Sequence, residues 1–188
     1  NDPFTWASGW HSPIYTDNRK TLAYPEIRSF VKQELVHLVH EHFADATAVA
    51  GVATGAIAQG ALVADELGLP FCYVRSKAKD HGMGNLIEGT LPEGAKVVVV
   101  EDLISTGGSS LKAVEALREA GFKVVGMVAS YTYGFQIAEE AFNAADLKLV
   151  TICDYEATTE IAAESGYISK EDIEVLKQWR KSPSTWKQ

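Results

Sequence analysis

An unbroken run of four valines, Val97–Val100, is the feature that most narrows the possible folds of this chain. β-Branched residues favour strands, and a strand that is apolar at every position, rather than at alternate ones, is typically buried on both faces. A helical pattern follows over residues 109–120 and stops at Gly121. A doubly buried strand that leads into a helix is the repeating unit of a parallel sheet covered by helices.

The same alternation of short apolar runs and helical patterns continues along the chain. Pro25 suits the first turn of a helix that extends to about residue 39. The remaining expected elements are strands over 46–52, 71–74, 96–100, 124–130 and 147–152, and helices over 56–67, 135–145, 158–164 and 170–179. This order predicts an α/β fold with a five-stranded, mostly parallel sheet flanked by helices. A length of 188 residues predicts a single domain over residues 1–188.

Composition and charge argue against several functional classes. The hydrophobic fraction of 46% and the charged fraction of 22% are ordinary for a globular protein. The longest aliphatic runs fall far short of the ~18 residues that suggest a membrane span. The net charge of −8 is opposite to that of a nucleic-acid-binding surface. Cys72 and Cys153 are too few for a disulfide framework, which predicts a reducing, cytoplasmic setting.

Two carboxylates, Glu101 and Asp102, directly follow the valine run, at the end of the strand where parallel sheets bind ligands. Small and hydroxyl-bearing residues then lead into the helix: Ser105, Thr106, Gly107, Gly108, Ser109 and Ser110. Glycines allow close approach of the backbone, and the N–H groups at a helix N-terminus bind phosphate. Carboxylates beside a phosphate fit sugar hydroxyls, a magnesium ion or a developing positive charge. The alternative is a tight turn whose serine caps the helix.

Residues 75–95 form a polar segment of a length that is usually functional or disordered in a compact domain. Basic side chains occupy alternate positions at its start: Arg75, Lys77, Lys79 and His81. Alternate side chains of an extended segment share a face, so these groups would form one cationic edge. We expect a lid that closes on a phosphate-rich leaving group. The alternative is a solvated charged loop.

The segment from Val97 to Ser110 resembles the ribose-phosphate-binding signature of the type I phosphoribosyltransferases. The resemblance implies the fold of that family, with a small hood formed largely by residues 1–24. It also implies that the acidic pair meets the ribose hydroxyls of phosphoribosyl pyrophosphate and that the next loop wraps the 5′-phosphate. The residues implied as ligands of this substrate are Glu101, Asp102, Leu103, Ile104, Ser105, Thr106, Gly107, Gly108 and Ser109.

Two further stretches are similar to the orotate phosphoribosyltransferases within that family. Residues 73–85 look like a catalytic loop that, in this group, reaches across a dimer into the neighbouring active site. The match gives Arg75, Lys79 and His81 as contacts of the pyrophosphate. Residues 4–19, which contain SGWHSPIY at 8–15, are similar to the stretch that selects the base, so Tyr15 and, from the phosphate loop, Ser105 are implied for orotate. Residues 50–55 correspond to the pyrophosphate loop of the family.

The resemblance therefore implies an enzyme, a glycosyltransferase of pyrimidine biosynthesis, that transfers the phosphoribosyl group to orotate and releases pyrophosphate. Its catalytic residues would be Arg75, Lys79, His81 and Asp102. It also implies Mg²⁺ bound mainly through the substrate, a homodimer, and no nucleic-acid or membrane partner. Two alternatives stay open: a phosphoribosyltransferase for another base such as a purine, and a non-catalytic regulator that senses phosphoribosyl pyrophosphate. A regulator that binds nucleic acid should carry a basic face, which the net charge of −8 fits poorly.

Overall fold

The computed structural model describes residues 3–6, 9–77 and 86–187. By their contacts, the residues form two compact units. The larger unit is Asn18–Asp154, and the smaller one combines Asn1–Asp17 with Tyr155–Gln188. Within the described residues, no helix has both the length and the apolar character needed to cross a membrane.

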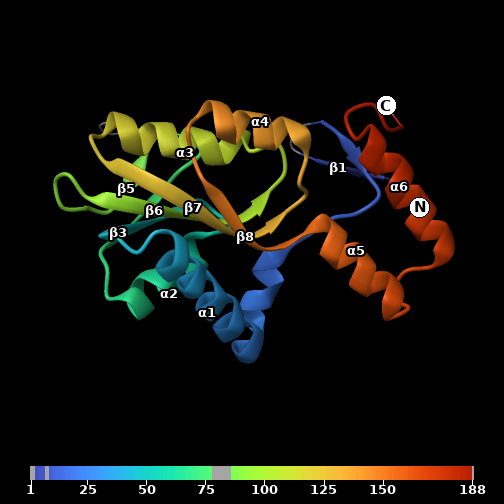
Figure 1. Ribbon diagram of the computed structural model, residues 1–188, viewed down its shortest axis with the longest axis horizontal. Helices are drawn as coiled ribbons and strands as arrows, with labels where there is room; N and C mark the ends of the chain where they lie inside the picture. The colour runs from blue at the N-terminus through green and yellow to red at the C-terminus, as the bar shows by residue number, and fades with distance from the viewer. Residues whose placement is uncertain (1–2, 7–8, 78–85, 188) are drawn as a thin grey trace. The chain divides into compact units, whose positions relative to one another are not determined.

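The larger unit is built on a sheet whose strands follow the order β5-β4-β3-β6-β7-β8 (Figure 1). The strands are β3 (Ala48–Val52), β4 (Phe71–Val74), β5 (Ile87–Glu88), β6 (Lys96–Ile104), β7 (Lys123–Thr132) and β8 (Leu149–Asp154). All neighbouring pairs are parallel except β4 and β5. The α/β fold is confirmed. Within the described residues the sheet has six strands rather than the expected five, because Ile87–Glu88 forms a short antiparallel edge strand beside β4.

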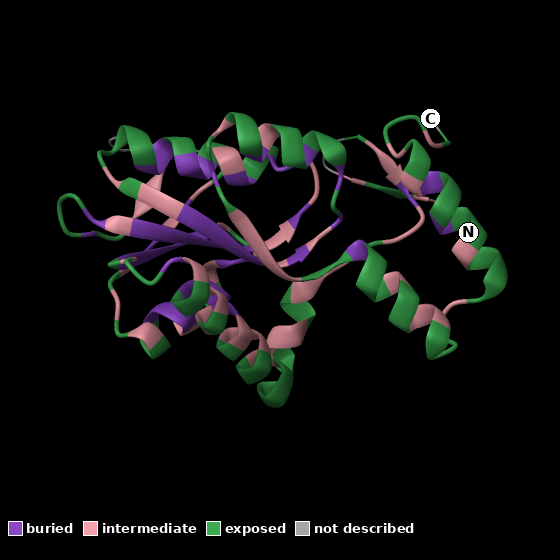
Figure 2. Cartoon of the chain, in the orientation of Figure 1, coloured by how far each residue is buried: buried purple, intermediate pink, exposed green. Residues whose placement is uncertain are grey.

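Helices cover both faces of this sheet (Figure 1). They are α1 (Pro25–His42), α2 (Ile57–Leu67), α3 (Gly108–Glu119) and α4 (Gln136–Ala144), and a 3-10 turn, η1 (Asn18–Ala23), precedes α1. α1 and α2 pack on one face and α3 and α4 on the other. The central strands are buried between them, whereas the outer surfaces of the helices are exposed (Figure 2).

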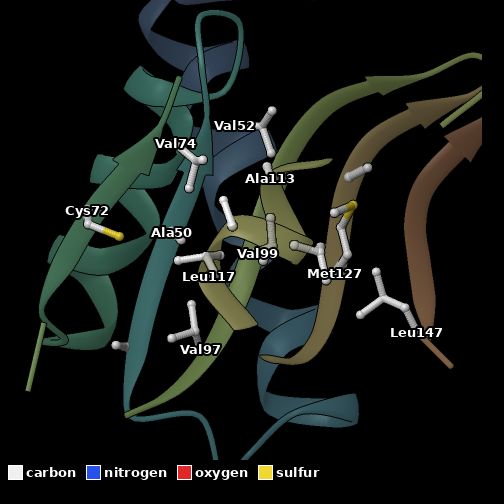
Figure 3. Close-up of a cluster of buried hydrophobic side chains, with 14 of the residues drawn as sticks. Ala50, Val52, Cys72, Val74, Val97, Val99, Ala113, Leu117, Met127 and Leu147 are labelled. Carbon is white, nitrogen blue, oxygen red and sulfur yellow. The ribbon is translucent and has the colours of Figure 1, made fainter. Parts of the chain in front are cut away.

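The valine run explains this double cover. Val97 and Val99 lie in the core beneath α3 and α4, together with Leu117 (Figure 3). Val98 and Val100 lie in the core beneath α1 and α2. All four valines are 0% exposed. Because side chains alternate between the faces of a strand, an unbroken apolar run fills both cores.

β6 extends beyond the apolar run that predicted it. The expected strand ended at residue 100, but β6 continues to Ile104. Its pairing with β7 continues past the acidic pair, with Glu101 opposite Ala129 and Leu103 opposite Tyr131. Backbone pairing therefore maintains the strand where the side chains become polar, and it holds the acidic pair on a strand rather than on a loop.

The smaller unit joins a hairpin to two helices. β1 (Phe4–Thr5) pairs antiparallel with β2 (His11–Ser12), and the helices are α5 (Tyr155–Glu164) and α6 (Lys170–Lys181). α6 begins with a capping box formed by Ser169 and Asp172. The opening segment, which was expected to form most of a hood, shares this unit with α5 and α6, and the hood itself stays a prediction.

Trp179 is the centre of the smaller unit. Its side chain is 0% exposed, and its indole N–H donates to the His11 carbonyl at 3.0 Å. The Trp6 ring packs edge-on against it, and the Tyr155 ring tilts against it at 5.6 Å between centroids. A buried indole with a satisfied N–H is a strong anchor, so this residue connects the opening segment to α6.

Candidate active site

The acidic pair at the end of β6 places two carboxylates in unlike surroundings. Glu101 is 4% exposed, whereas Asp102 is half-buried. Neighbouring residues on a strand point to opposite faces, so the two carboxylates have different neighbours: Glu101 meets Ser110 of α3, and Asp102 lies against Gly55. The pair that the sequence presents as equivalent is therefore divided into an inner and an outer carboxylate.

Glu101 is held by donors from the chain itself. The Ser110 hydroxyl donates to its Oε2 at 2.7 Å, and the Asp102 backbone N–H donates to its Oε1 at 2.9 Å. Burial raises the pKa of Glu101 well above its usual range, and the neighbouring charge of Asp102 raises this pKa further. The Ser110 hydroxyl was expected to face a phosphate. That expectation is wrong, because its single proton is directed to Glu101.

Asp102 lies against the turn that follows the neighbouring strand, β3. A Cβ atom built on Gly55 would come within 2.0 Å of Asp102 Oδ2. Only glycine can therefore occupy position 55 without moving this carboxylate. On its backbone side, Asp102 accepts a hydrogen bond of 2.7 Å at its carbonyl oxygen from the Asn18 side-chain amide.

The turn between β6 and α3 leaves backbone donors at the start of a helix. Gly107, with φ of 80°, lies immediately before α3 and packs so closely that a Cβ would come within 2.8 Å of the Phe142 ring. No side chain among the described residues caps this helix, so its first N–H groups are available to an anion. Ser109 is exposed, and Ser105 and Thr106 are half-buried. This geometry suits a bound phosphate.

Two residues of the predicted phosphate loop belong to the strand. Ile104 is 0% exposed and packs in the core beneath α3 and α4. Its side chain therefore cannot contact a ligand, and only its backbone groups could do so. Leu103 is half-buried. Both therefore differ from the exposed Gly108 and Ser109, which lie on the first turn of the helix.

The basic segment begins at the end of β4. The backbone N–H of Arg75 donates to the Leu86 carbonyl at 2.8 Å, and its guanidinium lies 3.4 Å from a carboxylate oxygen of Glu88 on β5. Lys77 is exposed. Lys79 and His81 lie outside the described residues. The structure thus places Arg75 beside the strand edge, and the roles of the other two stay predictions.

Tyr15 belongs to the smaller unit. Its ring is 56% exposed and lies 5.7 Å from the Phe4 ring, centroid to centroid. An exposed aromatic face can stack on a planar base. The assignment of Tyr15 and Ser105 to orotate stays a prediction.

Two residues of the site gave little signal in the sequence. Asn18 was part of the matching opening segment but carried no expected role. Gly55 was part of the predicted pyrophosphate loop, where its backbone was expected to matter. The reason for a glycine becomes visible only when the turn after β3 is placed against Asp102.

Comparison with known proteins agrees with this geometry. Residues 26–165 match the family described as phosphoribosyl transferase domain. The chain is 64% identical over 186 residues to the orotate phosphoribosyltransferase of Porphyromonas gingivalis, covering 99% of this chain and 89% of the relative.

Solved structures show the same likeness. Orotate phosphoribosyltransferase from Aeropyrum pernix matches with a TM-score of 0.77 and 32% identity, over 89% of this chain and 92% of the other. UMP synthase from Leishmania donovani matches with a TM-score of 0.79 and 26% identity, over 94% of this chain and 39% of the other.

Proposed function

This chain belongs to the phosphoribosyl transferase family, and from that membership we propose how the edge of its sheet carries out the reaction. The enzyme transfers the 5-phosphoribosyl group from phosphoribosyl pyrophosphate to orotate, in pyrimidine biosynthesis. The products are orotidine 5′-monophosphate and pyrophosphate. The observation that carries the proposed mechanism is the half-buried Asp102 carboxylate at the end of β6, one short turn before the uncapped N-terminus of α3.

The ribose 5-phosphate part of the substrate fits this turn. The first N–H groups of α3, with Ser105, Thr106 and Ser109, bind the 5′-phosphate. The Asp102 carboxylate accepts a hydrogen bond from a ribose hydroxyl. It also lies near the ribose ring, where positive charge develops as the bond to pyrophosphate breaks. Glu101 already accepts two hydrogen bonds, but a carboxylate has about four acceptor positions, which leaves room for a ribose hydroxyl.

The leaving pyrophosphate needs its charge neutralised. Arg75 does this from the end of β4, and Lys79 and His81 act with it from the same segment. Mg²⁺ commonly binds through one or two carboxylates together with substrate phosphates, and Asp102 is the half-buried carboxylate at this edge. The oxygens of the substrate would supply most of the ligands of the ion, and Asp102 is the residue of this chain that could add to them. When bound, it offsets the charge of the leaving group.

We propose that the active protein is a homodimer in which residues 75–90 of one subunit complete the site of its partner. Mixing two inactive variants tests this. A Lys79→Ala homodimer and an Asp102→Asn homodimer each have two defective sites, whereas a hybrid with a shared loop regains one intact site. Activity should return when the two proteins are co-refolded. Continued inactivity of verified hybrids would show that the loop acts within its own subunit.

The absorbance of orotate tests the reaction itself. Orotate absorbance should decay only when the protein, phosphoribosyl pyrophosphate and Mg²⁺ are all present, and added pyrophosphate should reverse the decay. Turnover with a purine base and none with orotate would favour the alternative enzyme. Binding of phosphoribosyl pyrophosphate without turnover of any base would favour the regulator.

The cellular location and the kind of partner that we propose rest on the cysteines and the net charge of the chain. We propose a cytoplasmic enzyme that acts on small molecules, with no nucleic-acid or membrane partner. The support is the presence of two free thiols, with the pKa of buried Cys72 raised by burial to about 11, and a net charge of −8.

A further inference from the structure

Asp102 is constrained on three sides by groups of its own chain. Its backbone N–H donates to Glu101, its carboxylate lies against Gly55, and its carbonyl accepts from Asn18. The first constraint comes from the acidic pair itself on β6, and the second comes from the turn after β3. Asn18 comes from a separate segment of the larger unit, 84 residues away in sequence.

The position of Asp102 in the sheet explains why this third contact matters. β3 pairs with β6 only as far as Gly51 opposite Val100. β6 continues to Ile104, so Asp102 lies past the end of that ladder. The Asn18 amide donates to the Asp102 carbonyl at 2.7 Å in this region, where β3 offers no further paired residue. A buried or half-buried carbonyl needs such a donor.

Asn18 is itself well supported. It is the first residue of η1, and the Thr21 hydroxyl donates to its carbonyl at 2.6 Å. Further along η1, the carbonyl of Leu22 accepts from the Arg28 guanidinium on α1 at 2.9 Å. The amide of Asn18 is therefore presented from a short turn that is braced against the following helix.

We propose that Asn18 is a positioning residue, whose side-chain amide fixes the peptide plane of Asp102 and so aims the Asp102 carboxylate at the ribose. This inference rests on the function proposed above. Without the amide, the peptide that follows Asp102 can rotate, and the carboxylate moves with it. A misplacement of about 1 Å at a reacting centre can cost about a hundredfold in rate, so a holder of this kind affects catalysis without touching the substrate.

The test replaces Asn18 with a neutral residue of similar size. Asn18→Leu removes the donor and adds no charge, so anion binding is not changed by repulsion. We expect kcat/KM for phosphoribosyl pyrophosphate to fall by about tenfold to a hundredfold. Thr21→Val is the matched control, because it removes a hydrogen bond within η1 and leaves the amide of Asn18 in place. We expect it to lower kcat/KM by less than about threefold.

Binding of two small probes separates positioning from general damage. Isothermal titration should show that Asn18→Leu lowers the affinity for ribose 5-phosphate by about tenfold. The affinity for inorganic phosphate should change by less than about twofold, because only ribose 5-phosphate reaches Asp102. Equal losses for both probes, or equal effects of Asn18→Leu and Thr21→Val, would assign Asn18 a purely structural role. Unchanged binding and turnover in Asn18→Leu would also overturn the inference. A wild-type protein that does not bind phosphoribosyl pyrophosphate would instead overturn the proposed function.

Discussion

The turn after β3 and the turn after β6 lie at the ends of neighbouring parallel strands and contribute in opposite ways. The end of β6 brings two carboxylates, and the turn after it brings several hydroxyls. The turn after β3, residues 53–56, contains no ionisable side chain. Its contribution is space, since the absent Cβ of Gly55 is what makes room for the Asp102 carboxylate. The comparison teaches that the Asp102 carboxylate can take its position only because the neighbouring turn has no side chain at position 55.

The largest expected effect concerns the acidic end of β6. Asp102→Asn keeps the size of the side chain and removes its charge, so it should lower kcat by about 10²–10³, the scale of losing one electrostatic stabiliser. Steady-state orotate absorbance measures this effect. A loss below about tenfold would mean that Asp102 only binds the ribose and does not stabilise the charge that develops on it.

The second prediction concerns the turn that provides space. Gly55→Ala would place a Cβ 2.0 Å from Asp102 Oδ2, and the end of this side chain can swing away at little cost in stability. We expect kcat/KM to fall by about a hundredfold. The melting temperature should change by less than about 3 °C, because the core is untouched.

Gly51→Ala is the matched contrast for that variant. Its Cβ would lie 2.8 Å from the backbone oxygen of Ala56, which cannot swing away, so the melting temperature should fall. If Gly55→Ala instead loses stability and activity together, as Gly51→Ala is expected to do, the turn after β3 has a structural role and the comparison fails.

A smaller effect is expected at the inner carboxylate. Ser110→Ala removes the hydroxyl that donates to Glu101 Oε2 and leaves a buried oxygen short of a partner. The free energy of unfolding should fall by about 1–3 kcal/mol. Urea denaturation measures this change, and Ser109→Ala, on the exposed side of the same turn, is the control for stability. Equal stabilities of the two variants would contradict the inward role of Ser110.

The smallest effect is a dependence on pH. Burial raises the pKa of Glu101 in the folded chain, so its contribution to stability is fully present below its unfolded pKa and is lost as pH rises through the folded one. Glu101→Gln does not titrate. The melting temperature of this variant, minus that of the wild type, should therefore increase between about pH 4 and pH 8. A difference that stays constant over this range would show that Glu101 is not desolvated.

The sequence predicted those parts of the molecule that side-chain patterns determine. The valine run correctly indicated a strand covered on both faces, and the acidic pair was correctly placed at its end. The extension of β6 to Ile104 was not predictable from hydrophobicity, because pairing with β7 maintains it. The strand β5 was missed for a similar reason, since two residues in a polar segment give no periodic signal.

The candidate site was predicted as a set of residues but not as an arrangement. Glu101 and Asp102 look equivalent in the sequence, and the different neighbours that they meet on the two faces of the strand make one of them inner and the other outer. Asn18 could not be found from local pattern, because its partner is the backbone of a residue 84 positions away. Backbone partners leave no trace in residue type, so contacts of this kind require the fold.

The contact of the opening hairpin with α6 through Trp179 has a consequence for folding during translation. The larger unit is one continuous stretch, Asn18–Asp154, whose core can close as soon as that stretch has left the ribosome. The hairpin of the smaller unit is translated before the larger unit, but α6, the helix it packs against, is translated after the whole of the larger unit. During that interval the Trp6 ring lacks Trp179, the ring it packs against in the folded unit, so we expect chaperones that recognise apolar side chains to bind this hairpin.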